Sequence, residues 1–280
     1  MSRIKLPVRL TKKVLAKELG ISRSSLYYVS KQRIKDWQFK TRIEEALHEE
    51  SGYGHKRLAP VLKAGKNRVK RVMKLFGIKP YRRRGKKPWK KAGNELPAYP
   101  NLLREFTPSG PNQAWVADFT HVVFKGRTIY LATVMDLWTR EILGFSVSAS
   151  HSVWLIIEAL LMALWQRPPP LIHHSDRGSE YKSGSYTGLE EFFGINISMS
   201  EKASPWENGY MESFYSQFKV DLGDPNRFEE MGELIAEIYQ TLHHYNTKRI
   251  HTSLGMMSPK EFAILKTINN PEYLGAEKVS

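Results

Sequence analysis

The alternation of apolar and polar positions predicts a β-rich segment in the middle of the chain. Between Gln113 and Ser150, three runs are rich in β-branched and aromatic residues, which is typical of strands. A period of two places Asp118 on the same face as Val116 and Thr120, opposite Trp115. The three runs read QAWVADFTHVVF, RTIYLATVMD and EILGFSVSAS.

A long helix and a short strand are predicted after these runs. The pattern over 151–166 indicates a helix that three prolines end, with Trp154, Leu155, Leu161, Met162 and Trp165 as core candidates. The strand LIHHS then leads directly to Asp176. Ligand-binding groups of α/β folds usually lie at such carboxyl ends of strands.

A second predicted helix begins near Ser204. Ser204 as N-cap, Pro205 at the first position and Glu207 at the third form a capping box. Glu212 lies at the edge of the apolar stripe, five residues after Glu207, so these two side chains point about 140° apart. Only one of them can serve a given site. Glu207 has a local structural role, so Glu212 is the better catalytic candidate. The stripe consists of Met211, Phe214, Tyr215, Phe218 and Leu222.

The N-terminal part has a helical pattern and predicts two small helix-turn-helix modules. In the first, over 11–32, Gly20 supplies the turn. A helical hairpin without a DNA role has the same pattern. The second helix of this module would present Arg23, Ser24, Ser25 and Tyr28 to a major groove.

The second module follows the same plan. A helix over 55–64, a turn at Gly65 and a cap at Asn67 precede a helix over 68–76. The inner side of that helix is apolar and its outer side is basic. Two such units in tandem favour DNA binding more than either does alone. The basic residues are Arg68, Lys70, Arg71 and Lys74.

Charge separates the chain into a basic front and a mildly acidic back. Residues 1–95 contain 28 Lys and Arg against 7 Asp and Glu, whereas residues 96–280 contain 15 against 21. The segment YRRRGKKPWKK, 81–91, has seven basic residues, and Gly85 and Pro88 argue against a helix. A flexible linker is the alternative, but the charge density favours an arm along DNA phosphates or in a minor groove. The arm residues are Arg82, Arg83, Arg84, Lys86 and Lys87.

Composition limits the remaining classes. The absence of cysteine excludes disulfides and thiolate zinc sites. No secretory signal or membrane span is expected, so a cytoplasmic protein is predicted.

Three carboxylates are the candidate catalytic and metal-binding residues: Asp118, Asp176 and Glu212. Oxygen ligands suit Mg²⁺ or Mn²⁺, and two such ions can promote phosphoryl transfer. Asp136 is an alternative, but it ends its strand where a turn residue is expected. Lys219, two turns beyond Glu212, is a candidate phosphate contact. His173 and His174 are interpreted as packed or hydrogen-bonded rather than metal-binding.

WVADFT, HSDRGSEY and ENGYMESF resemble the three blocks of the DDE integrase core, and thirty-five residues separate Asp176 from Glu212. The chain is most similar to the second-reading-frame product, OrfB, of the IS-three family of insertion sequences. SGYGHKRL and YNTKRIHTSLGMMSPKEF resemble further signatures of that family. One departure is ENG where many relatives have DNA, which changes position 207 and not Glu212.

The resemblance implies an RNase H-like α/β fold, with a five-stranded mixed sheet and flanking helices, preceded by the all-α modules. It also implies a transposase that binds the terminal inverted repeats, frees a 3′ end and joins it to target DNA with two metal ions. A homo-oligomer on DNA and a frameshift fusion to an upstream-frame (OrfA) product are further implied partners. A nuclease of the same fold and a non-catalytic DNA-binding protein are the rival interpretations.

The predicted domain boundaries follow from these patterns. They are a helix-turn-helix and following helix over 1–50, the second module over 51–80, and the arm and linker over 81–111. The catalytic core covers 112–225, and a C-terminal helix and tail cover 226–280.

Overall fold

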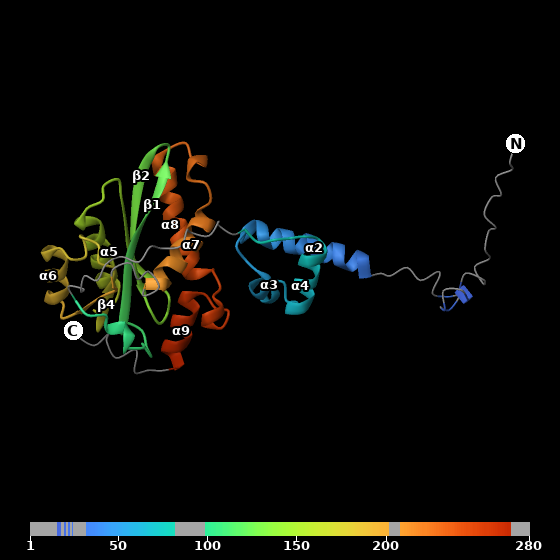
Figure 1. The fold of residues 1–280 in the computed structure, drawn as a ribbon, viewed down its shortest axis with the longest axis horizontal. Coiled ribbons are helices and arrows are strands. Elements are labelled where there is room, and N and C mark those ends of the chain that lie inside the picture. Colours follow the sequence, from blue (N-terminus) through green and yellow to red (C-terminus); the bar gives the residue numbers. More distant parts are fainter. Residues whose placement is uncertain are drawn as a thin grey trace.

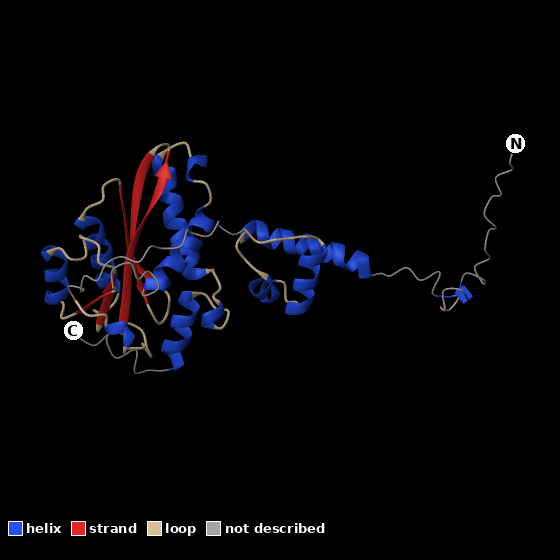
Figure 2. Ribbon diagram, in the orientation of Figure 1, coloured by secondary structure: helices blue, strands red, loops and turns tan. Residues whose placement is uncertain are grey.

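A mixed sheet of five strands forms the central layer of the larger part of the computed structural model (Figures 1 and 2). The structure describes residues 16, 17, 20, 22, 24, 32–81, 99–201 and 208–269. The strand order is β3-β2-β1-β4-β5. The first three strands are antiparallel neighbours, and β4 pairs in parallel with both β1 and β5. The predicted mixed sheet is therefore confirmed. The strands are β1 (Ala114–Phe124), β2 (Arg127–Asp136), β3 (Ile142–Ser148), β4 (Ile172–Ser175) and β5 (Asn196–Met199).

Helices cover both faces of this sheet (Figure 2). The core on one face includes Val116 and side chains of α7 and α8. The core on the other face includes Trp115 and Ala117 with side chains of α5 and α6. Successive residues of β1 thus enter different cores, as the period of two predicts. The helices are α5 (Val153–Gln166), α6 (Gly184–Phe192), α7 (Gly209–Leu222) and α8 (Met231–Thr247), with α9 (Pro259–Asn269) after them.

The prediction of which α5 side chains enter the core is wrong for three of them, including both tryptophans. Trp154, Leu161 and Trp165 are exposed, the last by 92%. The reason lies in β3, where a Cβ on Gly144 would come 2.0 Å from the carbonyl oxygen of Ala159. The helix backbone therefore approaches the strand at Ala159 and Ala163, and the three exposed side chains lie on other sides of the helix. Its buried residues are Leu155, Ile156, Ile157, Ala159, Leu160 and Ala163.

Three N-terminal helices share one small core. They are α2 (Gln32–Glu49), α3 (His55–Val61) and α4 (Lys66–Leu75). The N-cap of α4 is Gly65 rather than the predicted Asn67, so the helix begins two residues early. Gly65 already has the extended backbone that an N-cap requires, with ψ at 134°. The core consists of Phe39, Ile43, Tyr53, Leu58, Ala59, Leu62, Val69, Val72 and Met73.

Parts of the other predicted modules lie outside the described residues. In the first helix-turn-helix, Gly20 has a positive φ of 63°, as its predicted turn requires, and Ala16 is buried. Most of that module and nearly all of the basic arm lie outside the described residues. Among the described residues, no helix is both long and apolar enough to cross a bilayer.

Candidate active site

Asp118 and Asp176 occupy equivalent places on two neighbouring parallel strands. Val116 of β1 is the partner of His174 in β4, and both strands run in the same direction. Two residues further along the chain, Asp118 follows in β1 and Asp176 follows directly after the last residue of β4. Because neighbouring strands lie about 4.8 Å apart, the two aspartates are brought side by side at the carboxyl end of β4.

Glu212 reaches this region from the first turn of α7. The helix begins at Gly209 with Asn208 as its N-cap, later than the predicted start at Ser204. The predicted capping box of Ser204–Glu207 lies outside the described residues. The predicted apolar stripe is confirmed, because all five of its side chains are buried on the sheet. This packing fixes which side of α7 faces β1.

Two hydrogen bonds hold α7 against the stretch of β1 that contains Asp118. The Nδ2 of Asn208 donates to the carbonyl of Ala117 at 3.2 Å. The hydroxyl of Tyr215 donates to the carbonyl of Asp118 at 2.6 Å. Burial, and then the charge of Asp118, raise the pKa of Tyr215 well above its usual value, so the phenol remains a proton donor. Glu212 lies between these two attachments.

The carboxyl groups are half-buried and have local partners. Asp118 Oδ1 accepts from the N–H of Phe119, and Asp176 Oδ1 accepts from the N–H of Gly178, each at 2.8 Å. Burial raises the pKa of Asp176, and the charge of Glu180 adds to this effect. The Gly178 hydrogen bond and Lys182 act in the opposite direction. A cation bound here would stabilise the ionised carboxylate.

The donor chemistry of the site fits a hard divalent cation. All three candidate ligands offer carboxylate oxygens, which Mg²⁺ and Mn²⁺ prefer. The hydroxyl of Tyr181 is fully buried nearby without a hydrogen-bond partner in the described chain, and the charges of Asp118 and Asp176 both raise its pKa further beyond the effect of burial. Within that same part of the chain, no three acidic or histidine side chains already form a metal-binding cluster.

The competing candidates have structural roles. Asp136 is buried and accepts hydrogen bonds from the N–H groups of Asn112, Trp138 and Thr139, which is the turn role expected for it. His173 and His174 lie inside the sheet, as predicted. Their Nδ1 atoms lie 2.6 Å from Glu190 Oε1 and 2.8 Å from Ser198 Oγ, respectively.

The predicted DNA-binding residues of α4 are all exposed, but they differ in their contacts. Arg71 forms an ion pair with Asp36 of α2, and the guanidinium of Arg68 lies 4.3 Å from the centre of the Phe39 ring. Lys70 and Lys74 project from the same helix. Ser24 is exposed, and Lys219 is half-buried on α7. The remaining predicted contacts, Arg23, Ser25, Tyr28, Arg82, Arg83, Arg84, Lys86 and Lys87, lie outside the described residues.

A buried arginine that sequence reasoning missed connects the catalytic helix to the N-terminal helices. Arg249 Nη1 lies 2.6 Å from Asp221 of α7 and 3.2 Å from Glu50, which follows α2. The next backbone N–H, of Ile250, donates to the hydroxyl of Tyr53 at 3.0 Å. The only available signal was the position of Arg249 in the motif YNTKRIH, which contains no indication of its partners.

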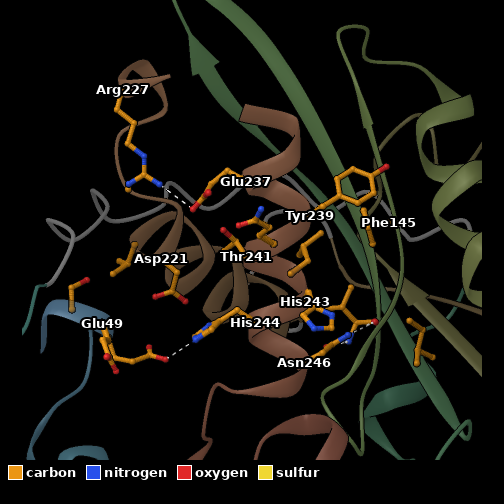
Figure 3. Close-up of a pocket in the computed structure, with 18 of the residues that line it drawn as sticks. Glu49, Phe145, Asp221, Arg227, Glu237, Tyr239, Thr241, His243, His244 and Asn246 are labelled. Atoms are coloured by element: carbon orange, nitrogen blue, oxygen red, sulfur yellow. Dashed lines mark hydrogen bonds and ion pairs between the residues drawn. The ribbon is translucent and has the colours of Figure 1, made fainter. Parts of the chain in front are cut away.

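A cavity of about 990 Å³ lies beside the ion pairs of Glu50 and Asp221, and not at the three candidate metal ligands. Figure 3 shows Asp221 and His244 around it, with the ion pair between His244 and Glu50 at 3.1 Å. The side chain of Asn246 closes its far side by exchanging two hydrogen bonds with the backbone of Ile142, at the edge of the sheet. None of the three candidate metal ligands lines this cavity.

The fold and the family matches define the class of protein, an RNase H-like integrase core. Residues 108–205 match the family described as Integrase core domain, and residues 193–259 match a second family with that description. The fold is also similar to a chain in the cryo-EM structure of the simian T-cell lymphotropic virus intasome in complex with PP2A regulatory subunit B56 gamma. The TM-score is 0.51 at 16% identity, over 78% of this chain and 73% of that chain.

The similarity to bacterial proteins is more specific. The transposase for insertion sequence element IS904 of Lactococcus lactis is 35% identical, over 83% of this chain and 96% of its own length. Transposase InsF for insertion sequence IS3A of Escherichia coli is 30% identical, over 89% and 93%. The chain therefore belongs to the IS3 family of insertion-sequence transposases, which are enzymes of the polynucleotidyl transferase type and act on DNA.

Proposed function

We propose that this transposase nicks the ends of its insertion sequence and joins the freed 3′ ends to target DNA at Asp118, Asp176 and Glu212. The observation that supports this most directly is the parallel pairing of β1 with β4, because Asp118 lies two residues beyond Val116 and Asp176 two residues beyond its partner His174. The hydrogen bonds of Asn208 and Tyr215 hold the first turns of α7, which contain Glu212, against the same stretch of β1. The proposed site thus draws on β1, on the residue that follows β4, and on α7.

The reaction is an in-line displacement at phosphorus. In the first step, a water oxygen bonds to the phosphorus and the bond to the 3′ oxygen breaks, which leaves a 3′-OH. In the second step, that hydroxyl attacks a phosphodiester of the target, and the strand 3′ oxygen of the target leaves. Two bound divalent cations, Mg²⁺ or Mn²⁺, would activate the attacking oxygen and stabilise the leaving one. The three carboxylates would hold these ions, and Lys219 would contact a phosphate of the DNA.

The partners of the chain follow from this reaction. Double-stranded DNA is bound as terminal inverted repeats and as target, mainly through the basic front, because phosphate contacts dominate affinity for DNA. Both element ends must be held together, which favours a homo-oligomer on DNA. An upstream-frame product fused by frameshifting would add a further DNA-binding segment. The protein acts on the nucleoid in the bacterial cytoplasm.

A pair of glutamine variants tests the assignment. Glu212→Gln removes one negative ligand and is expected to abolish joining while DNA binding is retained. Glu207→Gln is the matched control, because it makes the same change at a glutamate that is not a proposed ligand, and it is expected to retain joining. Junction PCR for excised circles, in cells that carry the gene with its flanking DNA, measures the outcome. Joining by Glu212→Gln, or a folded but inactive Glu207→Gln, would refute the choice of glutamate.

A further inference from the structure

The hydroxyl of Tyr215 lies at the centre of a hydrogen-bond chain between three elements of the fold. It donates to the carbonyl of Asp118 at 2.6 Å, and Thr133 Oγ1 lies 2.8 Å away. Because the phenol has one proton and gives it to the carbonyl, the Thr133 hydroxyl is the donor to Tyr215. Thr133 is the β2 partner of Asp118 in the sheet. The hydrogen-bond chain therefore runs from β2 through α7 to β1.

This hydrogen-bond chain is buried and close to a candidate ligand on each side. Thr133 is 1% exposed and Tyr215 is 6% exposed. Tyr215 follows Glu212 by three residues, so the two side chains are neighbours on the surface of α7. Asn208 makes the corresponding attachment one turn before Glu212, to the carbonyl that precedes Asp118. Its side chain is 5% exposed. Helix α7 is thus attached to β1 both before and after Glu212.

We propose that Tyr215, supported by Thr133 and Asn208, is a positioning residue that sets the separation between Glu212 and Asp118 for metal binding. This inference rests on the proposed function. A ring without the hydroxyl would still fill the core, but α7 would lose its bond to the Asp118 backbone. Groups that orient metal ligands typically change metal affinity about 10–100-fold when removed. Cooperative hydrogen-bond chains also strengthen one another in a buried setting.

Binding of Mn²⁺ to the full-length protein without DNA, measured by electron paramagnetic resonance, tests the proposal apart from catalysis. Tyr215→Phe is expected to weaken Mn²⁺ binding about 10–100-fold. Thr133→Val, which keeps the shape of the side chain, is expected to weaken it by a smaller factor. Tyr186→Phe is the matched control, because it removes a buried phenol of α6 on the opposite face of the sheet. It is expected to bind Mn²⁺ as wild type does.

Two further measurements separate the possible failures. Asp118→Asn is expected to abolish specific Mn²⁺ binding, and wild-type binding in that variant would overturn the proposed metal site itself. If Asp118→Asn loses the ion but Tyr215→Phe binds like wild type, the positioning role is refuted. The same conclusion follows if Tyr215→Phe and Tyr186→Phe weaken binding equally. If Tyr215→Phe does not fold, Thr133→Val decides, and unchanged binding in it overturns the proposal.

Discussion

Replacing Arg249 by methionine is expected to lower the free energy of unfolding by about 3–5 kcal/mol. The side chain is 1% exposed, and its two carboxylate partners, Asp221 and Glu50, are only 13% and 15% exposed. Burial raises the pKa of Asp221 even though Arg249 opposes this effect. Desolvation therefore outweighs attraction at this carboxylate, and removing the cation would leave two charges with little solvent. Since most domains are stable by about 5–15 kcal/mol, this loss is a large fraction of the total.

Urea denaturation with linear extrapolation measures the loss. The matched control is Arg227→Met, because Arg227 pairs with Glu237 at the surface, where the side chains are 48% and 30% exposed. Such exposed pairs contribute about 0–1 kcal/mol. A loss below about 1 kcal/mol for Arg249→Met, equal to that of the control, would refute the reasoning from burial.

Two other properties can be predicted from the structure. Gly144→Ala is expected to destabilise by at least about 1–3 kcal/mol in thermal or urea unfolding, because the new methyl group meets the backbone of α5. Gly188→Ala, where nothing lies within 4 Å, should instead stabilise by about 0.5–1 kcal/mol, and the same sign in both would contradict this argument. Burial, with Arg57, Arg249 and Arg140 nearby, lowers the pKa of His251 from 6.5 to about 3. The pKa of His251 is lower in the folded than in the unfolded protein, so the free energy of unfolding should fall as the pH drops from about 6.5 towards 3. The loss is at most about 1.4 kcal/mol per pH unit. His251→Gln should flatten this pH dependence, as measured by urea titrations.

Four of the five strands could be predicted from the sequence because their pattern is local, whereas no pattern indicated β5. The period of two in β1 correctly separates the two cores, and the bounds of those four strands agree to within two residues. The apolar stripe of α7 is equally local, since the spacing of its side chains depends only on the helix period. Strand patterns and the helix stripe therefore place Asp118 and Glu212 on the right elements, without information about their neighbours.

What the sequence could not provide are contacts between distant segments. The tryptophans of α5 have an apolar pattern, but a glycine in β3 decides which face of that helix approaches the sheet. Arg249 and Tyr215 appear in the sequence as one basic and one aromatic residue among many. Their importance depends on partners 199 and 97 residues away, which no local pattern reveals.

The bracing of α7 by residues near the C-terminus has a consequence for synthesis of the protein. The β1–β2–β3 meander consists of neighbours in sequence and can form early, whereas the parallel pairing of β1 with β4 must await a crossover. Arg249 contacts α7 only after the ribosome has added 28 residues beyond Asp221. A chain truncated before α8 would contain all three candidate carboxylates but lack the contact of Arg249 with α7. It would also lack the α8 side chains that share a core with the apolar stripe of α7, so that stripe would be left partly uncovered.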